Sequence, residues 1–345
     1  MRDSHPHVTR APGQRMSAMR RRWWVLGFVL VGCTGALPSA GPAVDAASVE
    51  TALPAETRLA PDIGVDRANG PGGARSDGTG GAIAIADASG ATETSGARDA
   101  NASNRVLIYA VTTNYRHDSI PAAAAALSQA MGKLGMTAEI VGASNDTNKA
   151  DRTRFTPDAL AQYGAVILLA NDGEPFGYPA DQEIQNLTNF VQNGGALVGL
   201  ECATDCYGGG FSGPMDGHPK SVPFHTLLGA TFTNHSDFGP ALCTKVGNHV
   251  SVAQLAQTFR TADEIYAFTD FRMDNQVVLT CVSGMLPGMV RPVAWYREEG
   301  AGRVFYSALG HPASDWTGPM DPNAESRLVE DHVLPGLLWS MKRSP

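Results

Sequence analysis

Residues 165–200 read AVILLANDGEPFGYPADQEIQNLTNFVQNGGALVGL, and this stretch decides the fold. Its two ends, residues 165–170 and 196–200, are continuous apolar runs of the kind that is buried on both faces of a parallel sheet. The segment between them, residues 181–192, repeats apolar residues on one helical face and stops at a Gly-Gly pair. A strand, a helix and another strand in this order predict two parallel strands joined by a right-handed crossover.

The same alternation continues on both sides of this stretch. A helix is predicted to begin at Ser119-Ile120-Pro121 and to end at Gly135, and a brief one opens at Thr156-Pro157. Further strands are predicted at residues 106–111, 137–141, 276–282, 292–297 and 303–307, with a final helix from about 325 to 341. We therefore expect an α/β domain over residues 104–345, with a doubly wound, mostly parallel, flavodoxin-like sheet.

Composition separates the first 103 residues from this domain. Residues 29–108 contain no Phe, Trp or Tyr, and residues 34–103 hold 18 Ala and 11 Gly. So little bulky apolar surface cannot offset the entropy of an ordered chain. We expect residues 34–103 to form a disordered tether.

The N-terminus has the features of an export signal. Met19-Arg20-Arg21-Arg22 is followed by ten apolar residues, too few to span a bilayer, and then by small residues. Leu30-Val31-Gly32-Cys33 has the form of a bacterial lipobox, so we expect residues 1–33 to be a lipoprotein signal and Cys33 to be lipidated. An ordinary signal peptide is the alternative, and translation is expected to start at Met16 or Met19. Either way the protein is expected to be exported to the cell envelope, and to meet the membrane only through a lipid anchor.

Charge argues against a nucleic acid partner. The domain carries 16 Lys and Arg against 24 Asp and Glu, so that it holds the whole net charge of -8. Binding to phosphates needs a positive surface, and this sequence has no basic run in the domain. A neutral small molecule is the expected ligand.

Four cysteines lie in the domain. An even number in an exported protein favours disulfides, although the sequence alone does not distinguish the three possible pairings. A zinc site at the Cys-x-x-x-Cys segment is the weaker alternative, because no second close pair of Cys or His completes it. The disulfide candidates are Cys202, Cys206, Cys243 and Cys281.

Chemically rich segments follow three of the predicted strands. They are residues 114–118 (NYRHD), 201–205 (ECATD) and 310–312 (GHP). Ligands of open α/β sheets bind beyond the carboxyl ends of the strands, so we expect these segments to meet at one edge. His117, Glu201 and His311 are therefore the catalytic candidates. Taken alone, His218, His225 and His332 are expected to be structural.

Several blocks resemble the trehalose-utilisation (ThuA-like) family. They occur in the family's order: Arg116-His-Asp-Ser-Ile-Pro121, Gly194-Gly-Ala-Leu-Val-Gly-Leu200 with Ala203-Thr-Asp205, Asp263-Glu-Ile-Tyr266, Arg291-Pro-Val-Ala-Trp295 and Gly302-Arg-Val-Phe-Tyr-Ser-Ala-Leu-Gly-His311. The resemblance covers residues 105 to 342. It implies a fold similar to class I glutamine amidotransferases and a link to carbohydrate metabolism.

One position departs from the family pattern. After the strand at 196–200 the family usually has a His, where the amidotransferases keep a nucleophilic Cys, and this chain has Glu201. Cys202 stands one residue later, so its side chain is expected to leave the turn in another direction. A thiol mechanism and glutamine hydrolysis are therefore not expected.

The leading hypothesis is an enzyme that acts on a carbohydrate or sugar derivative, such as a keto-disaccharide, by hydrolase-like or isomerase-like chemistry. His117 and His311 would transfer protons, with Glu201 as base or orienting group. The alternative is a tethered module that binds sugar without chemistry. Candidates for contacts with the sugar are Arg116, Asp118, Asn171, Asp172, Asp205 and Trp316. Helix capping is the other role considered for Asp118 and Asp205, and burial for Trp316.

No cofactor is required by this hypothesis, but a divalent metal is an open variant. His and Glu at one sheet edge are able to bind an ion that polarises a carbonyl or activates water. His235 and His249, in the middle of the domain, are the weaker additional candidates for ligands. Residues 207–217, rich in Gly, are expected to form a loop over the sheet edge, and a lid is one role considered for it.

Overall fold

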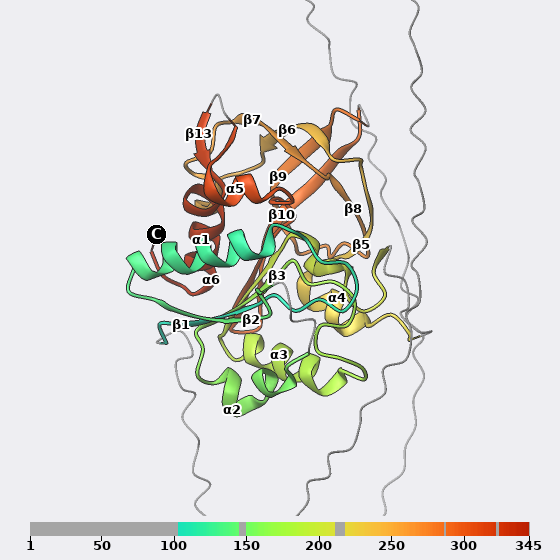
Figure 1. Cartoon of the computed structure of the whole chain (residues 1–345), viewed down its shortest axis with the longest axis vertical. Helices are drawn as coiled ribbons and strands as arrows, with labels where there is room; N and C mark the ends of the chain where they lie inside the picture. Colours follow the sequence, from blue (N-terminus) through green and yellow to red (C-terminus); the bar gives the residue numbers. More distant parts are fainter. Residues whose placement is uncertain (1–102, 145–149, 211–217, 286–287, 322–323, 345) are drawn as a thin grey trace, which may run out of the picture. The chain divides into compact units, whose positions relative to one another are not determined.

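A computed structural model describes residues 103–144, 150–210, 218–285, 288–321 and 324–344 (Figure 1). The expected signal, residues 1–33 with Cys33, lies outside these residues. The expected tether, residues 34–103, also lies outside them except for Ser103. So does most of the expected lid. Among the helices that the structure describes, none is long and apolar enough to cross a membrane.

A nine-stranded sheet forms the centre of the domain, in the order β2-β1-β3-β4-β11-β10-β9-β6-β7. Its strands are β1 (Arg105–Tyr109), β2 (Thr137–Val141), β3 (Ala165–Leu169), β4 (Ala196–Leu200), β6 (Gly239–Lys245), β7 (Thr258–Asp263), β9 (Gln276–Ser283), β10 (Val290–Glu299) and β11 (Gly302–Ser307). The strands are parallel from β2 to β11 and antiparallel from β10 to β7. The predicted α/β class is confirmed, and the parallel half contains the site.

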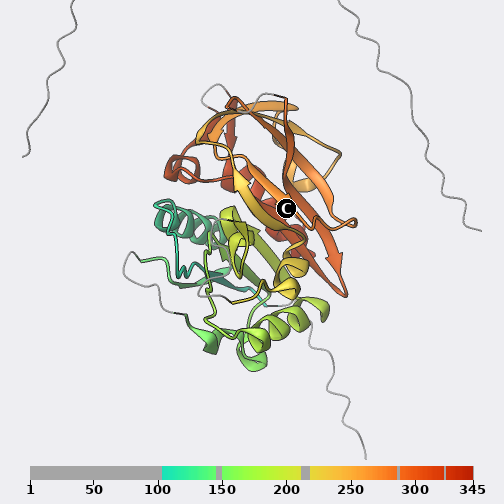
Figure 2. The same cartoon turned by 90° about the vertical axis from the view of Figure 1, so that its right-hand side faces the viewer.

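Helices cover both faces of the parallel half (Figures 1 and 2). Helix α1 (Ile120–Lys133) packs with α6 (Leu334–Ser340) on one face, while α2 (Pro157–Leu160), α3 (Asp181–Gln192) and α4 (Val222–Leu228) lie on the other. The apolar face predicted for α3 is buried against the sheet, and β3 and β4 are buried along their whole length. This is the sandwich expected when apolar strands alternate with amphipathic helices.

The antiparallel half comes from the middle of the chain, where no strands were predicted between residues 207 and 275. In addition to β6 and β7, it includes a small pair formed by β5 (Thr231–His235) and β8 (Tyr266–Thr269). In β7 buried and exposed residues alternate, which is the pattern of a strand with one covered face. The segment between β7 and β8 returns to the parallel half and brings residues to the site.

The prediction of disulfides is confirmed for Cys243 and Cys281 and is wrong for Cys202 and Cys206. Cys243 on β6 and Cys281 on β9 are cross-strand neighbours with 4.1 Å between their Cα atoms, and they form a disulfide. Cys202 and Cys206 are buried free thiols. The Cys202 sulfur instead approaches the Asn171 carbonyl oxygen at 3.3 Å.

The end of the chain also differs from the prediction. Short helical turns occur at Arg152–Phe155, Glu201–Asp205, Val250–Val252 and Ala313–Thr317 (α5). The final helix was predicted from residue 325, but β12 (Pro319–Asp321) and β13 (Ala324–Arg327) form a hairpin there, and helical structure begins at Val329. A π-helical turn, Val329–Val333, then leads into α6. The polar residues at 325–327 fit a small two-stranded sheet as well as a helix start, so pattern alone did not separate them.

Candidate functional site

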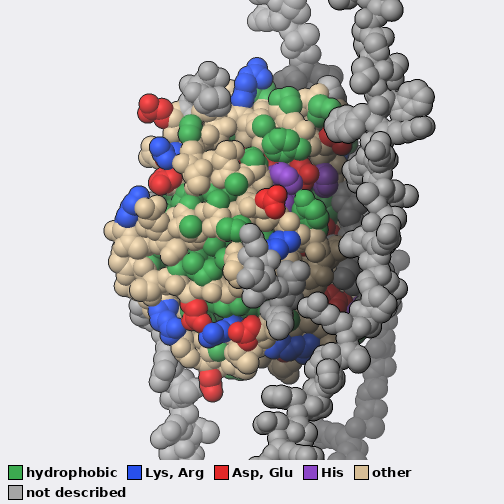
Figure 3. Space-filling model, in the orientation of Figure 1, with side chains coloured by type: hydrophobic (Ala, Val, Ile, Leu, Met, Phe, Trp, Pro, Cys, Tyr) green, Lys and Arg blue, Asp and Glu red, His purple; other side chains and the backbone are tan. Residues whose placement is uncertain are grey.

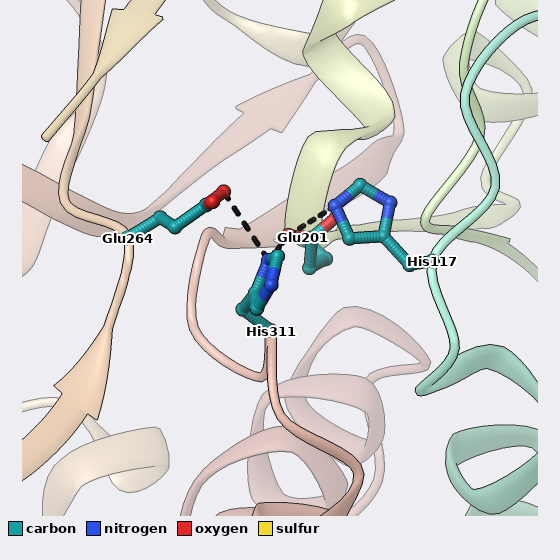
Figure 4. Close-up of side chains that lie close together, drawn as sticks. All are labelled: His117, Glu201, Glu264 and His311. Atoms are coloured by element: carbon teal, nitrogen blue, oxygen red, sulfur yellow. Dashed lines mark ion pairs between the residues drawn. The ribbon is translucent and has the colours of Figure 1, made fainter. Parts of the chain in front are cut away.

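The site lies where β1, β4 and β11 end. Strands β3, β4 and β11 are adjacent and parallel in the sheet, and β1 pairs with β3 on the other side. Their carboxyl ends therefore face the same way, and the segments that follow them carry His117, Glu201 and His311. The three catalytic candidates meet as expected (Figure 4).

Glu201 stands at a sharp turn from β4 into the helical turn Glu201–Asp205. Its φ of 58° lies in the left-handed region, which is rare for residues other than Gly and which occurs at functional sites. The side chain is 1% exposed. Its Oε1 accepts a hydrogen bond from the Tyr266 hydroxyl, its Oε2 accepts one from the Cys202 N–H, and its carbonyl oxygen accepts one from the Tyr306 hydroxyl.

Both imidazoles approach the same oxygen of Glu201. His117 Nε2 lies 3.2 Å from Glu201 Oε1, and His311 Nδ1 lies 3.7 Å from it. The two rings are nearly perpendicular, with 5.0 Å between their centres. Figure 4 shows the three side chains pointing toward one another from different elements.

Glu264 completes the cluster and was not among the predicted site residues. It lies between β7 and β8, and its Oε2 is 3.2 Å from His311 Nδ1. The preceding residue, Asp263, joins this segment to the His311 loop, because its Oδ2 accepts a hydrogen bond of 2.9 Å from the Gly310 N–H. The signal for it in the sequence is the Asp263–Tyr266 block, which resembles the family and contains two adjacent carboxylates.

The carboxylates and imidazoles shift one another's pKa values. Burial alone would raise the pKa of Glu201, but His117, His311 and the hydrogen bonds from Cys202 and Tyr266 lower it to about 2. Burial alone would lower the pKa of His311, but Glu201 and Glu264 raise it to about 10. Near neutral pH, Glu201 is therefore ionised and His311 is protonated when no other cation is present.

A cavity of about 420 Å³ opens beside this cluster. That volume lies in the range of small-molecule sites. On the face drawn in Figure 3, His and acidic side chains lie next to one another, and Lys and Arg are interspersed with Asp and Glu. The cavity is lined by Asn114, Tyr115, His117, Asp172, Cys202, Asp205, Phe232, His235, Glu264 and Tyr266.

The sequence profile of the family described as trehalose utilisation (ThuA) matches residues 105–340. The chain belongs to the trehalose-utilisation (ThuA) family. A ThuA-like protein from Parabacteroides merdae has a similar structure, with 15% identity, a TM-score of 0.51, and coverage of 70% of this chain and 91% of that one. This likeness shows the fold.

Two more solved structures are similar at lower scores. A ThuA-like protein from Bacteroides uniformis has 18% identity and a TM-score of 0.49, with 68% of this chain and 90% of that chain covered. A glutamine amidotransferase from Thermotoga maritima has 13% identity and a TM-score of 0.37, with 69% and 96% covered. No curated protein matches the chain.

Of the six residues predicted to contact a sugar, two line the cavity of this ThuA domain. Asp172 and Asp205 are buried carboxylates in its wall. Asp172 Oδ1 also accepts a hydrogen bond of 3.2 Å from the Tyr115 N–H, and so holds the loop that carries His117.

The other four do not line this cavity. Arg116 donates hydrogen bonds to the carbonyl oxygens of residues 110, 142 and 144, and Asn171 Nδ2 donates one of 2.8 Å to the Val111 carbonyl oxygen. Trp316 is 4% exposed, and its indole N–H donates to the Gly310 carbonyl oxygen at 2.8 Å. Asp118 is exposed. The side chains of Arg116, Asn171 and Trp316 therefore bind backbone carbonyl oxygens in this structure. Their contacts with sugar hydroxyls stay predictions.

Cys202 is next to the cluster, yet it lacks the properties of a nucleophile. It is 3% exposed, and burial together with the Glu201 and Asp172 carboxylates raises its pKa well above the usual range. Its sulfur lies 3.5 Å from His117 Nδ1. Glu201, not Cys202, takes the left-handed position of the ThuA turn, in agreement with the one-residue offset noted in the sequence.

The two weaker metal candidates lie in different places. His235 lines the cavity, with Nδ1 at 3.7 Å from Glu264 Oε1. His249 does not belong to the site, because its ring stacks on Tyr296 at 4.0 Å and its Nδ1 is 2.8 Å from the Ser251 hydroxyl. The group able to hold an ion consists of His117, Glu201, Glu264 and His311.

Proposed function

We propose that this ThuA domain is an enzyme that acts on a carbohydrate or sugar derivative, such as a keto-disaccharide, in the cavity beside the His and Glu cluster. The observation that carries the proposal is the convergence of His117, Glu201 and His311 from three separate strand ends, with His117 in the wall of a cavity of about 420 Å³. The name of the family supports a carbohydrate as the ligand.

The pKa shifts in the cluster indicate a different chemical role for each side chain. Glu201, with a pKa lowered to about 2, is a weak base and serves to orient both imidazoles. His311, with its pKa raised to about 10, supplies a positive charge that stabilises negative charge on a substrate oxygen. His117 lines the cavity, and it is the group that we assign to proton transfer.

The cavity wall suits a hydroxylated ligand. Asp172 and Asp205 provide carboxylates that accept hydrogen bonds from hydroxyl groups, and Tyr115 and Phe232 provide apolar ring surface for the faces of a sugar. Tyr115 is 58% exposed, so a ligand is able to reach its ring.

The test is to incubate the purified full chain with ordinary and 3-keto disaccharides and to follow the products by chromatography. Turnover is expected for at least one sugar. It should fall by on the order of 100-fold or more in His117→Ala, because general acid–base groups contribute about 10²–10⁴ in rate.

The matched control is His218→Ala. His218 also pairs with a carboxylate, Glu174, at 2.6 Å, but it does not line the cavity, so full activity is expected. Sugar that binds and remains unchanged would contradict the enzyme and support the module that only binds. Equal turnover in His117→Ala and the native chain would remove His117 from the mechanism.

The place of action is also a proposal. We infer an exported, lipid-anchored protein of the bacterial envelope from residues 1–33, with Cys33 as the lipidated residue. The Cys243–Cys281 disulfide supports an oxidising compartment.

A further inference from the structure

We propose that His117, Glu201, Glu264 and His311 bind one divalent transition-metal ion, with one ligand atom from each side chain. The four ligand atoms all lie within 4.8 Å of one another. They come from the segments after β1, β4 and β11 and from the segment between β7 and β8, and Figure 4 shows them directed at a common point.

The spacing of the ligand atoms fits a small ion. Zinc bound by nitrogen and oxygen has bond lengths of about 2.0–2.1 Å, so the ligand atoms of a tetrahedral site are about 3.3 Å apart. Three separations are close to this value: 3.2 Å from His117 Nε2 to Glu201 Oε1, 3.7 Å from His311 Nδ1 to the same oxygen, and 3.2 Å from His311 Nδ1 to Glu264 Oε2. The remaining pairs lie within 4.8 Å, so rotations of the side chains that shorten a separation by at most about 1.5 Å would bring them into coordination.

The surroundings of His117 favour the tautomer that a metal requires. The Cys202 thiol has one proton, and the Asn171 carbonyl oxygen at 3.3 Å is able only to accept it. The sulfur then accepts from His117 Nδ1 at 3.5 Å, which places the ring proton on Nδ1. With the ring proton on Nδ1, the lone pair of His117 Nε2 faces Glu201 Oε1 at 3.2 Å, and an ion between these two atoms would be coordinated by both.

His311 offers a second nitrogen to the same ion. Its Nδ1 is buried and, among the residues that the structure describes, has no hydrogen bond of good geometry, although two carboxylates lie within 3.7 Å. With both imidazoles neutral, the two carboxylates carry a charge of -2, which one divalent ion would neutralise in place of the protons. Glu201 is 1% exposed, so its compensating charge comes from the cluster and not from water.

The ligand set also selects the class of ion. Imidazole suits Zn²⁺, Fe²⁺, Co²⁺ and Ni²⁺, whereas Mg²⁺ and Ca²⁺ prefer oxygen ligands alone. The outer contacts of a metal site are present as well, because Tyr266 and the Cys202 N–H each hydrogen-bond an oxygen of Glu201. His117 and Glu264 also line the cavity, so a fifth ligand from a substrate has access to the ion.

This inference goes beyond the proposed function and does not depend on it. In the metal-free chain His117 and His311 have the roles proposed above, whereas with an ion bound they would be its ligands and the ion would polarise a carbonyl or activate water. Metal binding and sugar turnover are measured separately, so either proposal is able to fail alone.

The test uses the full chain, purified without a polyhistidine tag, stripped with a chelator and dialysed. Titration with Co²⁺ alone, followed by visible absorption and checked by equilibrium dialysis with elemental analysis, is expected to show one ion per chain that Zn²⁺ displaces. Glu264→Gln and His311→Gln are expected to weaken Co²⁺ binding by on the order of 100-fold. Loss of a group that only hydrogen-bonds a ligand costs about 10–100-fold in metal affinity, and loss of a ligand should cost at least as much. Glu264→Asp should recover part of the affinity.

Two controls accompany the titration. His218→Gln should bind as the native chain does, since its His–carboxylate pair lies outside the cluster. Thermal unfolding in chelator should show that the Glu264 and His311 variants fold, as expected for side chains that are 14% and 24% exposed. Less than about a tenth of an equivalent of bound ion, equal affinity in Glu264→Gln, or a thiolate-to-cobalt charge-transfer band from Cys202 would overturn the ligand set.

Discussion

Glu201 is a carboxylate shielded from water, and neighbouring groups take the place of the solvent. A buried carboxylate without partners would be protonated, because burial disfavours the charged form. His117, His311, Tyr266 and the Cys202 N–H reverse this effect and lower the pKa to about 2. Near neutral pH, Glu201 therefore places a negative charge at the centre of the site.

Tyr266→Phe tests how much the hydroxyl group of Tyr266 contributes to the free energy of unfolding. The variant removes the hydroxyl that donates to Glu201 Oε1, and it is expected to lower the free energy of unfolding by about 1–3 kcal/mol. Denaturation in urea measures the change. Tyr115→Phe is the control, because that side chain is 58% exposed and its loss of a hydroxyl should cost far less. Equal stability of Tyr266→Phe and the native chain would contradict the role given to the hydroxyl.

At the scale of elements, the disulfide joins two strands of the antiparallel half. Cys243 and Cys281 are 38 residues apart in sequence, and closing a loop of this length restricts the unfolded chain enough to add up to about 4 kcal/mol. A reductant is therefore expected to lower the free energy of unfolding by about 2–4 kcal/mol. The Cys243→Ala/Cys281→Ala variant should be equally destabilised and insensitive to the reductant, since Cys202 and Cys206 are free thiols. Sensitivity in that variant would show that another disulfide exists.

The elements of the parallel half were predictable because their patterns are strong. Strand β4 and helix α3 match the predicted ranges, since β4 is buried and apolar throughout and α3 has one apolar face. Strand β2 also matches its range, although it lies at the edge of the sheet and none of its residues is buried. Strands β5, β6, β7 and β8 were not predicted from the sequence. In β6 and β8 several positions are half-buried, which weakens any alternation between apolar and polar residues.

The site was predictable to the extent that it depends on strand ends. His117, Glu201 and His311 follow neighbouring parallel strands, and topology alone brings them to one edge. Glu264 could not be placed in this way, because the segment between β7 and β8 reaches the site through the antiparallel half. Arg116, Asn171 and Trp316 bind backbone carbonyl oxygens in this structure, and a sequence does not show whether a polar group binds a ligand or a backbone carbonyl.

For the whole molecule, the buried histidines outside the site make stability depend on pH. His225, His249 and His332 all have pKa values that burial lowers to about 4. The unfolded chain then binds more protons than the folded one between about pH 6.5 and 4. Their contribution is complete above pH 6.5 and is lost as the pH falls. Asp263 acts in the opposite direction, since burial raises its pKa to about 8.

Because these contributions oppose one another, the effect of one histidine is best measured as a difference. His332 is fully buried, with Nδ1 at 2.8 Å from the Ser251 carbonyl oxygen and Nε2 at 3.1 Å from the Ser307 hydroxyl, and Gln offers a donor and an acceptor without titrating. Between pH 7 and 5 the native chain is expected to lose on the order of 2 kcal/mol of stability relative to His332→Gln. Unfolding in urea at several pH values measures this difference. Ser340→Ala, which removes a buried hydrogen bond to Gly336, should lower stability equally at every pH. If His332→Gln and the native chain kept a constant difference, the neutral, buried state of His332 would not be responsible for the acid sensitivity.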